Sequence, residues 1–315
     1  MDLIFPEPGP GESWDPHTIH THYFGFSIPE NTIGVFIYVR AQPYFKTCLA
    51  GVSVFKGMDN LRPLDCEHNN IINTVPWPTV EGNVIHIANG MTFDFLEPGN
   101  KVRLLYRSKD GETHFDVTQT ALHPMLPRGY VMPGEEKNTN PSQNPTGLEQ
   151  LMKCTGSLTI HGRTYNVNCH AARDRSIRQV RTEDEIVSPP YGWSPISFGP
   201  DFCFNQAGFE DPGQNPAWLS IFPWPKDKPT TTFAWLVRGE HDVRNVVRVQ
   251  RKVLAYHPVL GSAVKQEMEI EDDKGEIYRL KGQAIAVAQL PAWPNAMFVD
   301  SVYRWTDDKG RGMVS

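Results

Sequence analysis

The sequence predicts a mainly β protein built from antiparallel strands, with two similar units in tandem along the chain. Three observations support this fold class. Apolar and polar residues alternate with period two over many short runs, and two short segments recur in the same order. Prolines (27), glycines (25) and aromatic residues (16 Phe, 10 Tyr, 8 Trp) are numerous, which is typical of short strands joined by many turns. With 315 residues, the chain is long enough for two domains with separate cores.

Seven runs have the alternation and the Val, Ile, Phe and Tyr content of strands. They are residues 31–42, 46–57, 82–90, 100–111, 230–239, 276–290 and 297–305. SKDGET, residues 108–113, is a candidate for a tight turn between two strands. Helical character is confined to short pieces such as GLEQLMKC, residues 147–154.

Two self-similarities indicate the tandem repeat. GRTYNVNCHA (162–171) and GEIYRLKGQA (275–284) share the pattern G-x-x-Y-x-[VL]-x-x-x-A at an offset of 113. ALHP (121–124) and AYHP (255–258) match at an offset of 134, and the difference of 21 is close to the length of the Pro-, Asn- and Gly-rich segment 125–147. We therefore predict a first unit at 1–185 with a loop excursion at 125–147, and a second unit at 186–315.

Charge and composition exclude several classes of protein. The net charge of −6 argues against a nucleic-acid partner, which calls for a basic face. No window approaches eighteen apolar residues, so no membrane span is predicted, and the N-terminus lacks the features of a signal peptide. The five cysteines are widely spaced and unpatterned, which favours free thiols in a reducing, cytoplasmic environment. Association into a homo-oligomer is left open.

The segment LEQLMKCTGSLTIHGRTYNVNCHAARDRSIRQVR resembles a segment of the AttH-like and carotenoid 1,2-hydratase-like (hydroxyneurosporene synthase-like) proteins. Arg173, Asp174, Ser176 and Arg178 fall near that family's Arg-Asp-x-Ser-Trp-Gly-x-Arg signature, although Ile177 replaces the tryptophan and Arg178 the glycine. The resemblance covers residues 148–182 and extends more loosely over the remainder. It implies two tandem lipocalin-like (calycin-like) β-barrels. It also implies kinship with hydratases of carotenoids and prenylated flavonoids, and with pericyclases of related fold.

The arginine-rich stretch HAARDRSIRQVR, residues 170–181, has two interpretations. Arg173, Asp174 and Arg178 can form a buried network that joins the two barrels, because buried charge is tolerated when it is paired. Alternatively, the guanidinium of Arg175 can bind a substrate oxygen or anion. We expect the structural network first and the ligand contact second.

The stretch WDPHTIHTHYFGF, residues 14–26, supplies candidates for acid–base catalysis. His20 and His22 lie on one face of a predicted strand, as in some metal sites, but no carboxylate follows at cupin-like spacing, so no metal is expected. The better functional interpretation is an imidazole of near-neutral pKa, with Tyr23 beside it and Trp14 and Phe24 as walls of a substrate cavity. A solvated N-terminal strand is the alternative.

The stretch SFGPDFCFNQAGFED, residues 197–211, supplies a candidate general acid. Aromatic walls would desolvate Asp201 and raise its pKa, as hydration of an alkene requires. Trp193, Phe198 and Asn205 are then candidates for substrate contact. The alternative is an ordinary interdomain loop in which Asp201 caps a turn.

The remaining motifs narrow the chemistry. Residues 235–249, WLVRGEHDVRNVVRV, predict a hairpin turn with exposed, mixed charge, in which His241 is a lesser catalytic candidate. No phosphate loop, dinucleotide fingerprint, nucleophile elbow or zinc-ligand pair is found, so no cofactor is expected. We predict a cofactor-independent lyase of hydratase, dehydratase or retro-aldol type that acts on an apolar aromatic or terpenoid-like molecule. The alternative is a non-catalytic carrier of a hydrophobic ligand.

Overall fold

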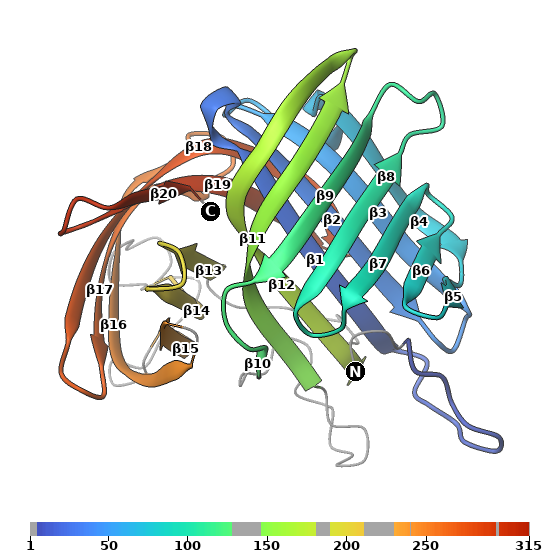
Figure 1. Cartoon of the computed structure of the whole chain (residues 1–315), viewed down its shortest axis with the longest axis horizontal. Coiled ribbons are helices and arrows are strands. Elements are labelled where there is room, and N and C mark those ends of the chain that lie inside the picture. Colours follow the sequence, from blue (N-terminus) through green and yellow to red (C-terminus); the bar gives the residue numbers. More distant parts are fainter. Residues whose placement is uncertain are drawn as a thin grey trace.

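The computed structural model describes residues 5–127, 146–180, 190–210, 230–239, 241–293 and 296–314. Over these residues the chain is nearly all antiparallel β-structure (Figure 1), with two short 3₁₀ helices, η1 (Pro29–Asn31) and η2 (Pro63–Asp65). No helix in this part of the chain is long and apolar enough to cross a membrane.

The first sheet has twelve strands in the order β4-β3-β2-β1-β12-β11-β9-β8-β7-β6-β5, with β10 paired to β11. Their bounds are β1 (Thr18–Ile28), β2 (Ile33–Gln42), β3 (Thr47–Lys56), β4 (His68–Pro76), β5 (Thr79–Glu81), β6 (Val84–Ile87), β7 (Met91–Glu97), β8 (Lys101–Arg107), β9 (His114–Ala121), β10 (Leu126–Pro127), β11 (Thr146–Ile160) and β12 (Arg163–Val180). All the strand pairs are antiparallel, and β12 returns to pair with β1.

The second sheet has eight strands that follow one another in sequence order from β13 to β20. Their bounds are β13 (Tyr191–Ser197), β14 (Cys203–Phe209), β15 (Thr231–Arg238), β16 (Asp242–Tyr256), β17 (Ala263–Asp272), β18 (Ile277–Trp293), β19 (Ala296–Asp307) and β20 (Gly312–Val314). The predicted unit boundary at 185/186 lies outside the described residues.

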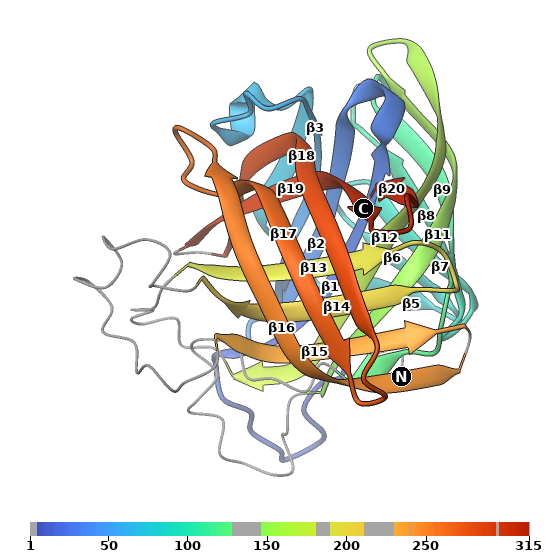
Figure 2. The same ribbon diagram turned by 90° about the vertical axis from the view of Figure 1, so that its left-hand side faces the viewer.

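Both sheets curl strongly. The first forms a nearly closed barrel and the second a half barrel at its side (Figures 1 and 2). The predicted fold class, mainly β with two barrel-like units in tandem, is therefore confirmed. All seven predicted strand runs are strands.

The sequence repeat has a counterpart in the strand pairing. In the first sheet β9, β11 and β12 pair in succession, and in the second sheet β16, β17 and β18 do the same. Tyr165 pairs with Leu158 just after one hairpin turn, and Tyr278 pairs with Ile270 just after the other, so the two tyrosines occupy equivalent positions. Most of the predicted excursion, residues 128–145, lies outside the described part of the chain.

One prediction of local structure was wrong. GLEQLMKC, expected to have helical character, forms the first half of β11. Leu, Glu and Met favour helices intrinsically, but pairing of this segment with β12, and of its end with β9, overrides that preference. Its side chains alternate: Met152 and Cys154 enter the core of the first barrel, whereas Leu151 packs toward the second sheet.

Four apolar clusters organise the packing. One fills the first barrel and another fills the concave side of the second sheet. The other two lie between the sheets. In one, Phe36 and Tyr38 of β2 meet Val302 of β19, and in the other, Leu151 and Ala172 meet Trp235 of β15. Because these two clusters bury side chains from both sheets, the units share an apolar interface.

Hydrogen bonds also link the two units. Asn60, 3% exposed, donates from Nδ2 to the carbonyl oxygen of Val287 on β18 at 3.0 Å. The backbone N–H groups of Val287 and Gln289 donate to the carbonyl oxygens of Gly57 and Asn60 at 2.9 and 3.1 Å. These bonds fix β18 against the segment that follows β3.

Candidate functional site

A row of polar side chains crosses the first sheet on the face turned toward the second sheet. Strand pairing aligns Glu149 on β11 with Asp174 on β12, and Asp174 with Tyr23 on β1. Tyr23 is in turn paired with Tyr38 on β2. Cross-strand partners share a face, and Tyr23 packs in both apolar clusters between the sheets. The row therefore lies in the interface between the two units.

The second sheet supplies the opposite wall. Trp193 on β13 and Trp235 on β15 belong to one interface cluster, and the Trp193 ring lies 5.5 Å from the Tyr23 ring, nearly perpendicular to it. Asp300 on β19 lies two residues from both Phe298 and Val302, which belong to the other cluster. Because alternate residues of a strand share a face, the Asp300 carboxyl group also points into the interface.

On the first sheet's side of the interface, Glu149 is the most buried carboxylate, with 1% of its surface exposed. Its Oε2 accepts a hydrogen bond from Asn205 Nδ2 on β14 at 2.5 Å and one from Trp235 Nε1 at 3.3 Å. Both donors come from the second sheet. The carboxylate thus ties three strands together across the interface and fixes the orientation of the Asn205 amide.

The titration of the site is set by burial. Burial raises the pKa of Asp300 to about 6, although the backbone N–H of Ser301 donates to its Oδ1 at 3.0 Å and opposes the shift. Burial, reinforced by the nearby carboxylates of Asp300 and Asp174, raises the pKa of Tyr23 well above its usual range. At neutral pH Tyr23 is therefore a hydrogen-bond donor and not a base. Asp300 can exchange a proton near neutral pH.

The two histidine candidates lie elsewhere. His20 and His22 point into the first barrel, where His22 is surrounded by the rings of Phe5, Phe24 and Phe93 at centroid distances of 5.1 to 6.0 Å. Burial lowers the pKa of His20 to about 4 and that of His22 well below its usual range. The expected imidazole of near-neutral pKa is thus not found, because burial disfavours the charged form.

Both ring nitrogens of His20 are already engaged. Its Nε2 lies 2.8 Å from the carbonyl oxygen of Pro6, and its Nδ1 accepts the backbone N–H of Arg178 at 2.9 Å. The Arg178 guanidinium lies 4.8 Å from the Trp14 ring, so Trp14 also belongs to this end of the barrel. His20, His22, Trp14 and Phe24 are therefore separate from the interface row.

Strand alternation divides the arginine-rich stretch. Arg175 pairs with His22 and Arg173 pairs with Phe24, and the Arg173 guanidinium lies 5.4 Å from the Phe24 ring inside the first barrel. Asp174 points to the opposite face with Tyr23. Arg173 and Asp174 therefore face opposite sides of β12, because successive strand residues alternate. The network of Arg173, Asp174 and Arg178 stays a prediction.

The backbone conformation of Arg178 bears on one departure from the family signature. Its φ of 57° is left-handed, a conformation that glycine adopts at no steric cost. Arg178 stands where the signature carries glycine. The pairing of β1 with β12 shifts register at this point, so the structure keeps the bulge that a glycine would favour.

Asp201 and Phe198 do not reach the interface row. Asp201 lies exposed in the turn between β13 and β14, and its carbonyl oxygen accepts a hydrogen bond from Arg238 Nε at 2.7 Å. The desolvated carboxyl group expected at Asp201 is therefore not found there. Phe198 packs on Phe202 inside the second unit. Of the predicted site residues, Tyr23, Asp174, Trp193 and Asn205 come together.

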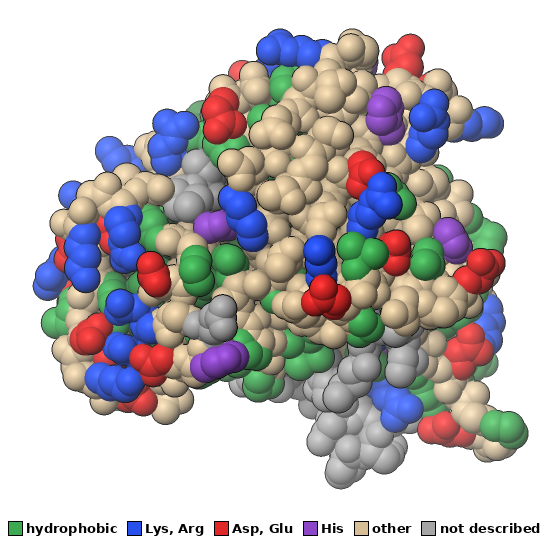
Figure 3. All heavy atoms as spheres, in the orientation of Figure 1, with side chains coloured by type: hydrophobic (Ala, Val, Ile, Leu, Met, Phe, Trp, Pro, Cys, Tyr) green, Lys and Arg blue, Asp and Glu red, His purple; other side chains and the backbone are tan. Residues whose placement is uncertain are grey.

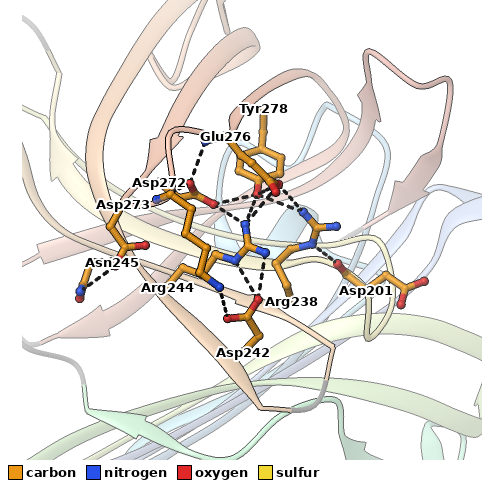
Figure 4. A network of polar contacts seen from close by, with 10 residues as sticks. Asp201, Arg238, Asp242, Arg244, Asn245, Asp272, Asp273, Glu276 and Tyr278 are labelled. Carbon is orange, nitrogen blue, oxygen red and sulfur yellow. Dashed lines mark hydrogen bonds and ion pairs between the residues drawn. The ribbon is translucent and has the colours of Figure 1, made fainter.

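The charged hairpin at residues 235–249 is more than an exposed turn. Its Arg244, 10% exposed, donates at 2.7 Å to Asp272, whose side chain is fully buried, and Tyr278 donates to the same carboxylate at 2.9 Å (Figure 4). Arg238 joins this network through Tyr278 at 3.0 Å, whereas His241 is exposed. The network closes one end of the second sheet. The outer face of this unit carries interspersed charges of both signs (Figure 3).

Three residues of the candidate site were not predicted from the sequence: Glu149, Trp235 and Asp300. Glu149 was not considered because its segment was expected to be helical. Asp300 carried a readable signal, because it is the one acidic residue inside the apolar run MFVDSVYRW. A lone charge at an inward position of a strand suggests a functional group or a paired one.

Comparison with solved structures supports the architecture. AttH from Nitrosomonas europaea matches over 100% of this chain and 95% of that chain, with a TM-score of 0.59 and 11% identity. CghA with Sch210972 matches over 93% and 84%, with a TM-score of 0.52 and 12% identity. Kievitone hydratase from Nectria haematococca matches over 94% and 87%, with a TM-score of 0.48 and 16% identity. The likeness to AttH and CghA confirms the fold that the sequence resemblance implied.

Sequence comparison is less informative. Residues 7–315 match a family described as "Domain of unknown function". No curated protein matches the sequence.

Proposed function

Because this chain belongs to the family DUF7064, whose description assigns no function, we propose its activity from its own site. We propose a cofactor-independent lyase that adds water to, or eliminates it from, an apolar small molecule by general acid–base catalysis. The observation that carries the proposal is Asp300, whose pKa burial raises to about 6, beside Tyr23 in an aromatic interface.

The proposed mechanism uses two carboxyl groups. In hydration, protonated Asp300 transfers its proton to one carbon of a carbon–carbon double bond, and water attacks the other carbon. The proton lost by that water passes to the Asp174 carboxylate, and dehydration is the reverse. Tyr23 lies close to both carboxyl groups and donates a hydrogen bond to the oxygen that enters or leaves. A retro-aldol cleavage would use the same parts: a base for the hydroxyl proton and an acid for the carbon.

The surroundings suit an apolar substrate. The rings of Trp193 and Phe36 lie within 5.5 and 5.6 Å of the Tyr23 ring, and Trp235 closes the far side beside Glu149. Aromatic walls supply large apolar contact area, and a few polar groups fix orientation.

The test is incorporation of ¹⁸O from labelled water into a prenylated phenol, 4-prenylphenol, with detection of the tertiary alcohol by mass spectrometry. We expect turnover that falls as pH rises above about 6, because Asp300 must be protonated. Asp300→Asn should lower the rate by at least about 100-fold. Asp201→Asn is the matched control, since its carboxyl group is exposed, and should leave the rate unchanged.

Two results would contradict the proposal. Full activity of Asp300→Asn would remove Asp300 from the acid role. Tight binding of 4-prenylphenol without any turnover would favour the carrier of a hydrophobic ligand instead.

A further inference from the structure

Two polar atoms on the second sheet's side of the interface have no hydrogen-bond partner in the part of the chain that the structure describes. Nε1 of Trp193, which can only donate, and Oδ1 of Asn205, which can only accept, are both buried and have no hydrogen-bond partner among the described residues. Buried polar atoms are almost always hydrogen-bonded, because leaving one unpaired costs its full desolvation penalty. A donor and an acceptor left open beside each other therefore indicate a ligand group that satisfies both.

The strand pairing places the two side chains near each other. Trp193 pairs with Ala207 and Asn205 pairs with Pro195, so Trp193 and Asn205 are diagonal neighbours on adjacent strands β13 and β14. Diagonal neighbours on one face are roughly 7–8 Å apart at their backbones, within reach of one small group held between the side chains. Both face the first sheet, since Trp193 contacts Tyr23 and Asn205 contacts Glu149.

The orientation of the Asn205 amide is fixed by its neighbour. Glu149 accepts from Nδ2 of Asn205 at 2.5 Å and from Nε1 of Trp235 at 3.3 Å. A flipped amide would set its carbonyl oxygen against the carboxylate oxygen, which has no proton to donate when ionised. The amide nitrogen therefore faces Glu149, and Oδ1 is held on the other side.

We propose that Trp193 and Asn205 recognise a hydroxyl group of the substrate. The hydroxyl oxygen accepts the indole N–H of Trp193, and the hydroxyl proton is donated to Oδ1 of Asn205. This inference rests on the proposed function for the location of the site. It defines the substrate class as a neutral alcohol or phenol. A methyl ether cannot donate a hydrogen bond to Asn205. A substrate carboxylate would be repelled by the carbonyl oxygen of Asn205 and by nearby Glu149. Glu149 is then a positioning residue.

The test compares the binding of 4-prenylphenol with that of its O-methyl ether by isothermal titration calorimetry. We expect the phenol to bind at least about tenfold more tightly to the wild type, because the ether leaves a buried acceptor unpaired. Trp193→Phe keeps an aromatic ring but removes the indole N–H, and should weaken phenol binding by about tenfold while ether binding changes little. Glu149→Gln lets the Asn205 amide reorient and should reduce the phenol preference. Trp14→Phe, in the first barrel, should change neither affinity.

The measurement separates this inference from the proposed reaction. In Asp300→Asn, whose rate should be at least about 100-fold lower, the phenol preference should persist. If the wild type prefers the phenol but shows no turnover, the recognition stands and the lyase proposal fails. Equal affinity for phenol and ether in the wild type, or failure of both to bind, overturns the recognition. An unchanged preference in Trp193→Phe does so as well.

Discussion

Replacing Asp272 with asparagine should change how the stability of this protein depends on pH. Asp272 lies at the centre of the network in Figure 4, with Arg244 at 2.7 Å and a side chain that is fully buried. Burial alone would raise its pKa, but the hydrogen bonds from Arg244, from the backbone N–H of Glu276 and from Tyr278 outweigh burial and lower it from 3.8 to about 2. The carboxylate is thus more stable in the folded state.

The sign and size follow from linkage. A depressed carboxyl pKa contributes stability that is fully present above the unfolded value of 3.8 and is lost as pH falls through the folded value of about 2. The full contribution is about 2.4 kcal/mol, and about 1 kcal/mol of it is lost by pH 3. Asp272→Asn carries no titrating group, so it should be less stable at neutral pH and should lack this part of the acid-induced loss.

The assay is urea unfolding of the wild type and Asp272→Asn at pH 7, 5, 4 and 3, followed by tryptophan fluorescence. Asp273→Asn is the matched control. The Asp273 side chain is exposed, so this substitution should leave the pH profile of stability unchanged. The difference in unfolding free energy between wild type and Asp272→Asn should shrink by about 1 kcal/mol between pH 7 and pH 3. A difference that stays constant over this range would refute the assignment of a stabilised carboxylate.

Three further predictions concern other parts of the chain. In His22→Phe the loss of stability between pH 6.5 and about pH 4.5 should be smaller than in the wild type. Burial lowers the folded pKa of His22 below 6.5, so acid favours the unfolded state by up to about 1.4 kcal/mol per pH unit; identical urea profiles would contradict this. Gly34→Ala should cost roughly 1–3 kcal/mol in thermal melts, because the added Cβ would clash with Phe55 and lie 2.7 Å from Val302, whereas Gly312→Ala should be tolerated. Treatment with a chelator should leave the melting temperature and any turnover intact, and a stoichiometric metal whose removal abolishes either would prove this wrong.

The fold was predictable because its signals are local. Period-two alternation located the strands, and the repeated Gly-x-x-Tyr and His-Pro segments indicated two related units; these segments coincide with two hairpins of the same strand order. The segment 147–154 was misassigned because intrinsic propensity was stronger in the sequence than the pairing that decides its structure.

The candidate site was only partly predictable because it depends on which face of a strand meets the second unit. Tyr23, Asp174, Trp193 and Asn205 were chosen for their chemistry and lie together. His22 and Arg175, equally plausible by composition, lie on the other face of the same two strands. Asp201 seemed desolvated because aromatic residues flank it, but its turn directs the carboxyl group to solvent. In a turn, apolar residues next to a side chain in the sequence therefore do not show that this side chain is buried.

The two faces of β12 have a consequence for how such a protein could diversify. Arg173 and Arg175 belong to the core of the first barrel, while Asp174 and Ser176 alternate with them toward the interface. Loss or gain of one residue before the bulge at Arg178 would exchange these environments, placing an acid in the barrel and arginines in the site. Under the proposed function, natural variation in substrate range should accumulate on β13, β14 and β15, which form the opposite wall, and β12 should tolerate little change in length or order.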